Sequence, residues 1–306
     1  MISSLSRSVR ERQDVHILAA AVAVFAWGTG PIMNKVMTVD TPAIVFYRTL
    51  LGTPLMVCVA YATGGGLSRE LMRRTAIPGV LFALSFITGF ASVKMTSIAN
   101  ATLITTIQPV LVVFIAPRLF GERLTPRQLG YSFLSLAGVL MVVMAAASSS
   151  GAHISGDMMA VANVVLWTAY FVMAKQNRMD GVHSWSFLAA VFVWLAVVVL
   201  PFGAVASNDL GQMTTKDWLC AAGMTLGPGL LGHGLMTWSQ SHVDVTIASL
   251  LGLLSPVVST ALALVFLGEI LTPWQLMGAI VVLASLGLLV ANQRGTTPKV
   301  SLEVPE

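Results

Sequence analysis

The sequence contains one nine-residue stretch twice, GERLTPRQL at 121–129 and GEILTPWQL at 268–276. The copies are 147 residues apart, and at the same separation Gln-Pro at 108–109 corresponds to Ser-Pro at 255–256. Internal similarity on this scale, in an apolar chain, is typical of a duplicated transporter fold.

The two halves also match near their starts. Trp27 and Lys35 are eight residues apart, and Trp167 and Lys175 have the same spacing. The sequence therefore predicts five parts: a cytoplasmic N-terminus at 1–14, a first repeat at 15–147, an external connector at 148–155, a second repeat at 156–292 and a cytoplasmic C-terminus at 293–306.

The composition places most of the chain in lipid. Of its 306 residues, 56% are hydrophobic and 10% are charged, whereas soluble domains carry roughly 25% charged residues. A helical span takes about 20 residues, so the length suits ten spans. We expect them near 15–37, 41–63, 76–97, 98–120, 126–147, 156–177, 183–206, 216–239, 244–267 and 273–292.

Five helices is an odd number, so the second repeat must enter the membrane from the opposite side. The predicted fold class is therefore an all-α membrane protein, with ten transmembrane helices as two inverted five-helix repeats around a central cavity. With the N-terminus inside, thirteen of the seventeen basic residues fall in cytoplasmic segments. The positive-inside rule then predicts two cytoplasmic termini, and we expect a multi-pass protein of a bacterial inner membrane.

Several other classes are disfavoured by the same residues. The basic residues are topology signals between apolar segments, so we expect a lipid bilayer but no nucleic acid as partner. Cys58 and Cys220 both lie in apolar stretches, without disulfide or metal spacing. The chain has no Walker loop, HExxH pair or GxSxG elbow. We expect neither a cofactor, a metal nor enzyme activity, and a monomeric state.

The repeated stretch itself is interpreted as structural. Thr125 and Thr272 are placed as N-caps, each followed by proline at the first helical position and by Gln128 or Gln275 three residues later. This is a capping box that starts the fifth and tenth helices. The accompanying Glu122 and Glu269 are given a structural role as well.

The fourth and ninth helices carry polar faces at helical spacing. Thr102, Thr105 and Gln108 form one face; Thr246, Ser249, Gly252, Ser255 and Ser259 form the other. Two such faces would line a cavity, but small and hydroxylated residues also favour close packing in lipid, and both interpretations stay open for Ser and Thr. Gln108 is a long amide in mid-span, which usually faces a bundle interior.

Aromatic residues form a third set. Trp27 and Trp167 lie about ten residues into their spans, too deep for interfacial anchors. Tyr170 and Asn163 lie one turn on either side of Trp167, and Phe86 and Phe90 share a face of the third helix. His233 lies inside the eighth span and is interpreted as a cavity wall, with a proton-linked switch as the alternative.

Few charges fall within the spans. Arg48 lies two turns into the second helix, where it would snorkel to the outer surface or pair internally. Lys35 and Lys94 fall near outer helix ends and Lys175 near an inner one. The alternative to a functional role for these lysines is anchoring at the membrane interface. We expect no cationic residue at mid-depth of the cavity, and the sequence places no acidic residue at the centre of a span.

The residues around both repeats resemble a known family. Ala101 through Pro109 to Glu122, with QLG at 128–130 and AGV at 137–139, is similar to one EamA repeat; 248–256 to 269, with Gln275, Leu276 and Gly278, is similar to a second. Arg48 resembles the arginine that these proteins carry early in the second helix. The chain thus resembles a ten-helix EamA-type member of the drug/metabolite transporter superfamily, similar in layout to aromatic amino-acid and paraquat exporters.

This resemblance implies a basket in which helices 1, 3, 4, 6, 8 and 9 surround the cavity and helices 5 and 10 lie at the back. It also implies export of amino acids or related metabolites, by rocking of the two halves. The predicted substrate-binding cavity comprises Trp27, Phe86, Phe90, Thr102, Gln108, Asn163, Trp167, Tyr170, His233, Trp238 and Ser255. The candidate vestibule charges are Lys35, Arg48 and Lys94, of which Lys35 and Lys94 would attract a carboxylate.

Three alternatives remain at this point. One is export of cationic drugs or other metabolites. Exchange of nucleotide sugars or phosphorylated sugars is less favoured, because it requires cations deep in the cavity. A non-transport role, as an intramembrane enzyme or lipid-binding scaffold, would require a catalytic cluster or a lateral groove.

Overall fold

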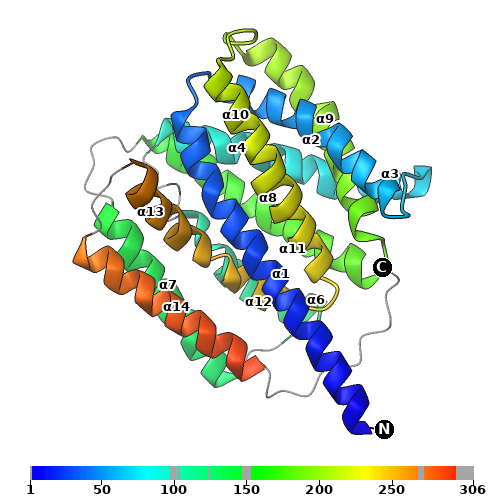
Figure 1. Cartoon of the computed structure of the whole chain (residues 1–306), viewed down its shortest axis with the longest axis vertical. Helices are drawn as coiled ribbons and strands as arrows, with labels where there is room; N and C mark the ends of the chain where they lie inside the picture. The colour runs from blue at the N-terminus through cyan, green and yellow to red at the C-terminus, as the bar shows by residue number, and fades with distance from the viewer. Residues whose placement is uncertain are drawn as a thin grey trace.

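The computed structural model describes residues 2–96, 101, 104–122, 125–146, 153–267 and 272–293, with side chains from Asp14 onward over most of these ranges. The described residues form a bundle of helices, with no strand among them (Figure 1). Two residues singled out above, Thr102 and Glu269, lie outside the described residues.

The first half contains α1 (Ile2–Val36), α2 (Thr41–Ala62), α3 (Arg69–Arg74), α4 (Ala76–Met95), α6 (Gln108–Leu119) and α7 (Pro126–Ala146). The second half contains α8 (Ile154–Met179), α9 (Ser184–Ala206), α10 (Thr215–Met224), the π-helix η1 (Thr225–His233), α11 (Gly234–Ser239), α12 (Val245–Leu251), α13 (Leu254–Leu267) and α14 (Pro273–Gln293).

Within the described part of the chain, seven helices are long and apolar enough to cross a membrane. They are Asp14–Val36, Thr41–Ala62, Ala76–Met95, Pro126–Met144, Ile154–Met179, Ser184–Ala206 and Pro273–Ala291. The other three expected spans are not single α-helices: the eighth runs without a gap through α10, η1 and α11, the ninth runs through α12 and α13 with a turn between them, and the fourth ends in α6.

The fourth and ninth segments break at corresponding places. A turn at 106–107 precedes α6, and a turn at 252–253 separates α12 from α13. Both turns are bridged by backbone hydrogen bonds between residues three apart, such as Ile107 N to Ile104 O and Leu253 N to Leu250 O. Each break is followed by a proline, Pro109 or Pro256, in the first turn of the next helix, where a missing N–H costs least.

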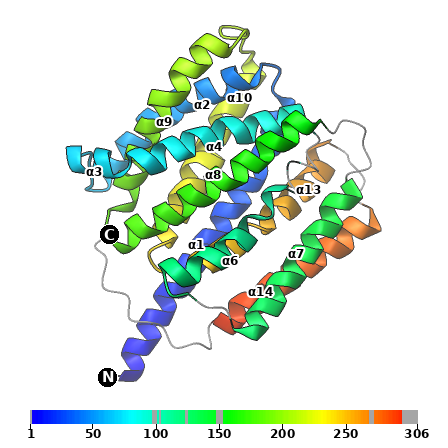
Figure 2. The ribbon, with the colours of Figure 1, turned by 180° about the vertical axis from the view of Figure 1, so that it is seen from behind.

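Helices at corresponding positions in the two halves of the chain make corresponding contacts. α4 packs on α8 as α1 packs on η1, and α2 packs on α9. α7 and α14 pack on each other and lie side by side at one edge of the bundle in both views (Figures 1 and 2).

α7 and α14 cross at two glycines. A Cβ atom on Gly138 would lie 2.9 Å from the carbonyl oxygen of Gly278, and one on Gly278 would lie 2.6 Å from that of Gly138. The neighbours of Gly138 include Val282, whereas those of Gly278 include Val142, so the two helices run antiparallel. Small residues allow the backbones to approach this closely, which is how helices associate in lipid.

The capping boxes predicted at the starts of α7 and α14 are confirmed. Thr125 N donates to Gln128 Oε1 at 2.9 Å and Gln128 N donates to Thr125 Oγ1 at 3.3 Å. The corresponding distances for Thr272 and Gln275 are 2.8 and 3.2 Å. These bonds satisfy N–H groups that have no acceptor within the helix.

Glu122 also has a structural role, but it bonds a distant helix, whereas Thr125 and Gln128 bond each other. Its carboxylate accepts from Val245 N at 2.9 Å, and from Thr246 N and Oγ1, both at 3.1 Å. It therefore caps α12 from a distant loop. Beside it, Lys175 is only 5% exposed and donates to Val243 O at 2.7 Å, so this lysine is buried and does not anchor the chain at a membrane surface.

Replacement of Gly138 by leucine should force α7 and α14 apart. Overpacking of this kind costs about 1–3 kcal/mol, so we expect a lower melting temperature in detergent. The matched control is Gly130→Leu on the same helix, because no atom lies within 4 Å of a Cβ at Gly130. Equal melting temperatures for the two variants would contradict this description of the crossing.

Glu122 should make stability depend on pH. Burial, followed by repulsion from Asp244, raises the pKa of Glu122 above its ordinary value, against the opposing effects of Lys175 and the backbone N–H groups. The folded state therefore binds the proton more tightly than the unfolded state, and the free energy of unfolding should fall as pH rises through this raised pKa. Glu122→Gln should flatten that slope in melting curves from pH 4.5 upward, whereas Glu70→Gln, at an exposed carboxylate, should not.

Candidate functional site

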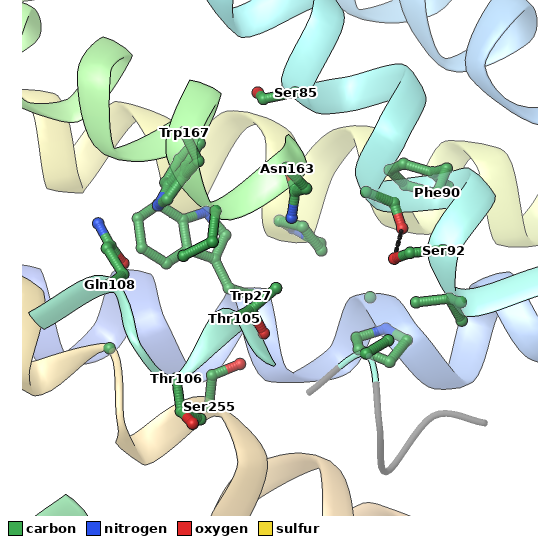
Figure 3. Close-up of a pocket in the computed structure, with 18 of the residues that line it drawn as sticks. Trp27, Ser85, Phe90, Ser92, Thr105, Thr106, Gln108, Asn163, Trp167 and Ser255 are labelled. Carbon is green, nitrogen blue, oxygen red and sulfur yellow. Dashed lines mark hydrogen bonds between the residues drawn. The ribbon is translucent and has the colours of Figure 1, made fainter. Parts of the chain in front are cut away.

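A cavity of about 340 Å³ lies in the middle of the bundle. Its walls come from α1, α2, α4, α8 and η1, and from the broken fourth and ninth segments; α7 and α14 contribute no residue to the described lining. The volume is in the range of small-molecule sites. Figure 3 shows Trp27, Gln108, Asn163 and Trp167 around the same space.

Two tryptophans and a histidine form one wall. The rings of Trp27 and Trp167 meet edge to face at 5.5 Å, and the His233 ring lies 5.4 Å from Trp27 and 5.7 Å from Trp167. Phe82 closes the group at 5.0 Å from His233. Edge-to-face geometry of this kind holds the rings in defined orientations.

The π-helix η1 determines which residues of the eighth segment face the cavity. Pro228 and His233 both line it, and they are five residues apart, which matches the hydrogen-bond spacing of a π-helix. The chain returns to an α-helix at Gly234. In an α-helix a further five residues turn about 140°, and Trp238 consequently faces elsewhere.

Arg48 lies in the wall of this cavity, with only 7% of its surface exposed. Its Nη2 donates to Met224 O at 3.1 Å, and its guanidinium carbon lies 4.9 and 4.8 Å from the ring centroids of Phe86 and Phe90. Phe86 is in the middle of α4 (Ala76–Met95). Arg48 therefore supplies a cation at mid-depth, where the sequence analysis expected none, and it does not snorkel outward.

Two buried donors at the cavity have no acceptor among the described residues. Neither Gln108 Nε2 nor Trp27 Nε1 has a hydrogen-bond partner within the described part of the chain. Asn34, a lining residue that is 3% exposed, likewise has an unpartnered Oδ1 among the described residues. Buried polar groups of this type cost free energy unless something binds them.

Some hydroxyl groups of the ninth segment serve helix packing and others line the cavity. Thr246 bonds Glu122, Ser249 Oγ donates to Thr246 O at 2.8 Å, and Ser259 Oγ donates to Gly28 O at 2.8 Å. These bonds serve packing, although Ser249 and Ser259 also border the cavity. Ser255 lines the cavity beside Thr106 (Figure 3).

Four predicted residues lie away from the cavity. Tyr170 is 2% exposed and packs behind the wall, 4.7 Å from Phe82 and 5.3 Å from Trp167. The Trp238 ring lies 4.0 Å from that of His16, which in turn stacks on His242 at 4.0 Å. Lys94 donates to Met37 O at 3.3 Å, and Lys35 is exposed and outside the lining.

Among the lining residues that the sequence did not predict are Asn34, Phe82 and Ser85. Helical periodicity gives a signal for two of them, because Asn34 lies two turns after Trp27 and Phe82 one turn before Phe86. The remaining predicted members that the structure describes, Trp27, Phe86, Phe90, Gln108, Asn163, Trp167, His233 and Ser255, all border the cavity.

The cavity is closed toward the end where α1 begins. Ile17, Ala20 and Val24 of α1 pack there in a buried cluster with Val112, Ala116, Phe171, Met236 and Val245, and none of these residues lines the cavity. In the other direction the lining continues to Asn34, near the end of α1. The described structure is therefore sealed at one end.

Comparison with known proteins supports a transport function. The model of the EamA-like transporter family matches the chain twice, over residues 15–144 and 154–291. A crystal structure with 18% sequence identity superposes with a TM-score of 0.72, covering 93% of this chain and all of that one.

Three curated relatives resemble the chain over most of its length. The "Pseudopaline exporter CntI" of Pseudomonas aeruginosa is 25% identical, covering 91% of this chain and 97% of its own. The "Aromatic amino acid exporter YddG" of Ancylobacter novellus is 25% identical, with 81% and 87% covered. The "Probable amino-acid metabolite efflux pump" of Salmonella typhimurium is 27% identical, with 87% and 92% covered.

Gly232 should be needed for the position of Trp27. A Cβ at Gly232 would lie 2.5 Å from Trp27 Cδ1 and Nε1, so Gly232→Ala should push the indole into the cavity and lower the melting temperature. The control is Gly227→Ala in the same π-helix, whose nearest neighbour would be 3.8 Å away. In a Trp27→Leu background, Gly232→Ala should cost little, because residues in contact couple; an unchanged cost would contradict the assignment.

Proposed function

We propose, because the chain belongs to the EamA-like transporter family, that it exports amino acids or closely related small metabolites. The observation that carries this proposal is a cavity of about 340 Å³, walled by aromatic rings and closed at one end. The donors of Gln108 and Trp27, which have no partner among the described residues, give such a cavity polar groups for a cargo. Two of the relatives are named for amino acids or their metabolites.

We further propose that transport occurs by alternating access between two inverted halves, residues 15–147 and 156–292, with ten spans. The exchange of helix contacts between the halves and the antiparallel crossing of α7 and α14 support this inversion. In inverted-repeat transporters the site lies near the midplane, where discontinuous helices line it. The breaks before α6 and between α12 and α13 border the cavity here.

In this proposal both termini are cytoplasmic, as the positive-inside rule predicts, and the membrane is the bacterial inner membrane. The sealed end is then the cytoplasmic end, and the described conformation faces outward. To load cargo from the cytoplasm, the chain must separate α12 from Glu122 and Val243 from Lys175. These contacts are specific to the conformation that is closed on this side.

The proposed roles follow from position. Trp27, Trp167, Phe86 and Phe90 would contact the apolar part of the cargo, and Gln108, Asn163 and Ser255 its polar groups. Cationic drugs are a weaker candidate, because the described lining contains no acidic side chain. Phosphorylated sugars are also weaker, because Arg48 is the one Lys or Arg side chain in that lining.

The experiment that tests the function is uptake of a panel of labelled amino acids into proteoliposomes, with and without a pH gradient. Saturable, selective uptake supports amino-acid transport, and dependence on the gradient would indicate proton coupling. If the folded protein transports no amino acid, the amino-acid part of the proposal is wrong.

Alanine at Gln108 or Trp167 should reduce this uptake by about 5- to 150-fold, since each removes a contact worth ~1–3 kcal/mol. The protein should remain folded, as judged by size-exclusion chromatography. Matched controls are Gln212→Ala in an exposed loop and Trp274→Ala, whose side chain is 62% exposed on α14. Wild-type uptake in both cavity variants would overturn the site assignment.

A further inference from the structure

We infer that Arg48 binds an anionic group of the cargo, a carboxylate in the case of amino acids, so that the cavity selects for molecules that carry one. This inference rests on the proposed transport function. It moves the charge recognition from Lys35 and Lys94, which do not line the cavity, to a side chain inside it.

The guanidinium group has donors to spare. It has five N–H groups, and its one hydrogen bond within the described part of the chain goes from Nη2 to Met224 O. Its Nε is buried without a partner among the described residues. Phe86 and Phe90 lie within 5 Å of its central carbon, and such ring contacts leave the N–H edge for hydrogen bonding.

The surrounding charge favours an anion. The described lining of the cavity includes Arg48 but no aspartate or glutamate, so no protein carboxylate there neutralises the cation. An ionised side chain in a membrane span is costly and usually marks a substrate or ion pathway. A carboxylate matches a guanidinium in both charge and geometry, and the resulting hydrogen bonds are charge-assisted.

The cavity also has a separate apolar pole. From Phe86 beside Arg48, a chain of rings continues through Phe82 to His233 and Trp27, with centroid distances of 5.9, 5.0 and 5.4 Å. A cargo with a carboxylate at Arg48 can therefore place an apolar or aromatic group against Trp27 and Trp167. This arrangement has the polarity of an amino acid with a large side chain.

A purely structural role for Arg48 gives a different expectation. The bond to Met224 O holds the residue that immediately precedes η1. If this were the only role of Arg48, replacing it would weaken the binding of acids and of their uncharged analogues equally. Carboxylate recognition instead predicts that replacing Arg48 weakens the binding of the acids much more than that of the uncharged analogues.

The first test uses the wild-type protein and needs no variant. Thermal stabilisation of the purified protein is measured with 3-phenylpropionate, 3-phenylpropionamide and 3-phenylpropylamine, and the same compounds compete against uptake of the best amino acid in the panel. The acid should bind about 10- to 100-fold more tightly than the amide, the factor expected for hydrogen bonds to a charged group. Equal or weaker effects of the acid would overturn the inference.

The second test assigns the preference to Arg48. Arg48→Gln, which keeps a donor for Met224 O, should abolish the difference between acid and amide, whereas Arg48→Lys should keep part of it. The control Lys94→Gln removes a cation outside the cavity and should leave the preference intact. If Arg48→Gln keeps the preference, the inference is wrong even though transport stands; if it does not fold, the wild-type series decides alone. Absence of amino-acid uptake with an intact preference for the acid would instead refute only the proposed amino-acid cargo.

Discussion

The structure depends on one constraint, which is that every backbone N–H and C=O inside a membrane must find a partner within the protein. An unbroken α-helix meets it locally, but the fourth and ninth segments contain turns and the eighth contains a π-helix. At 106–107 and 252–253 the gaps are bridged by tighter backbone turns, and at the start of η1 the Arg48 side chain occupies Met224 O. Irregular backbone at membrane depth is tolerated where it is buried in protein or lines a cavity, and here these segments line the cavity.

The two ends of the bundle differ in how they are held. At the sealed end, Glu122 and Lys175 bond the backbone at the start of the ninth segment across long sequence separations. Breaking these bonds costs little free energy once water reaches the groups, because a solvated carboxylate or ammonium regains hydrogen bonds from water. The α7–α14 crossing is different, since its closely packed glycines gain nothing from separation. We therefore expect α7 and α14 to stay together while the sealed end opens.

Arg48 connects the backbone constraint to the proposed chemistry. An arginine in a span is costly, and its one hydrogen bond to the described residues leaves most of its donors unused. Its position between the phenylalanines of α4 and the start of η1 joins two helices that both line the cavity. A bound anion would complete this arrangement, which links occupancy of the cavity to the packing of its walls.

The sequence by itself determined the features that rest on local interactions. Seven of the ten expected apolar segments coincide with described helices that are long enough to cross a membrane. The capping boxes at Thr125 and Thr272 form as predicted, because their bonds join residues three apart. Most described members of the predicted site border the cavity, because helical periodicity places them on one face. Only the tertiary structure decided that Glu122 caps α12, that Arg48 enters the cavity and that Trp238 leaves it. The first two depend on partners far away in the sequence. The third depends on where the π-helix ends, because from Gly234 onward the chain is α-helical and Trp238 is rotated away from His233; residue types alone do not specify that point.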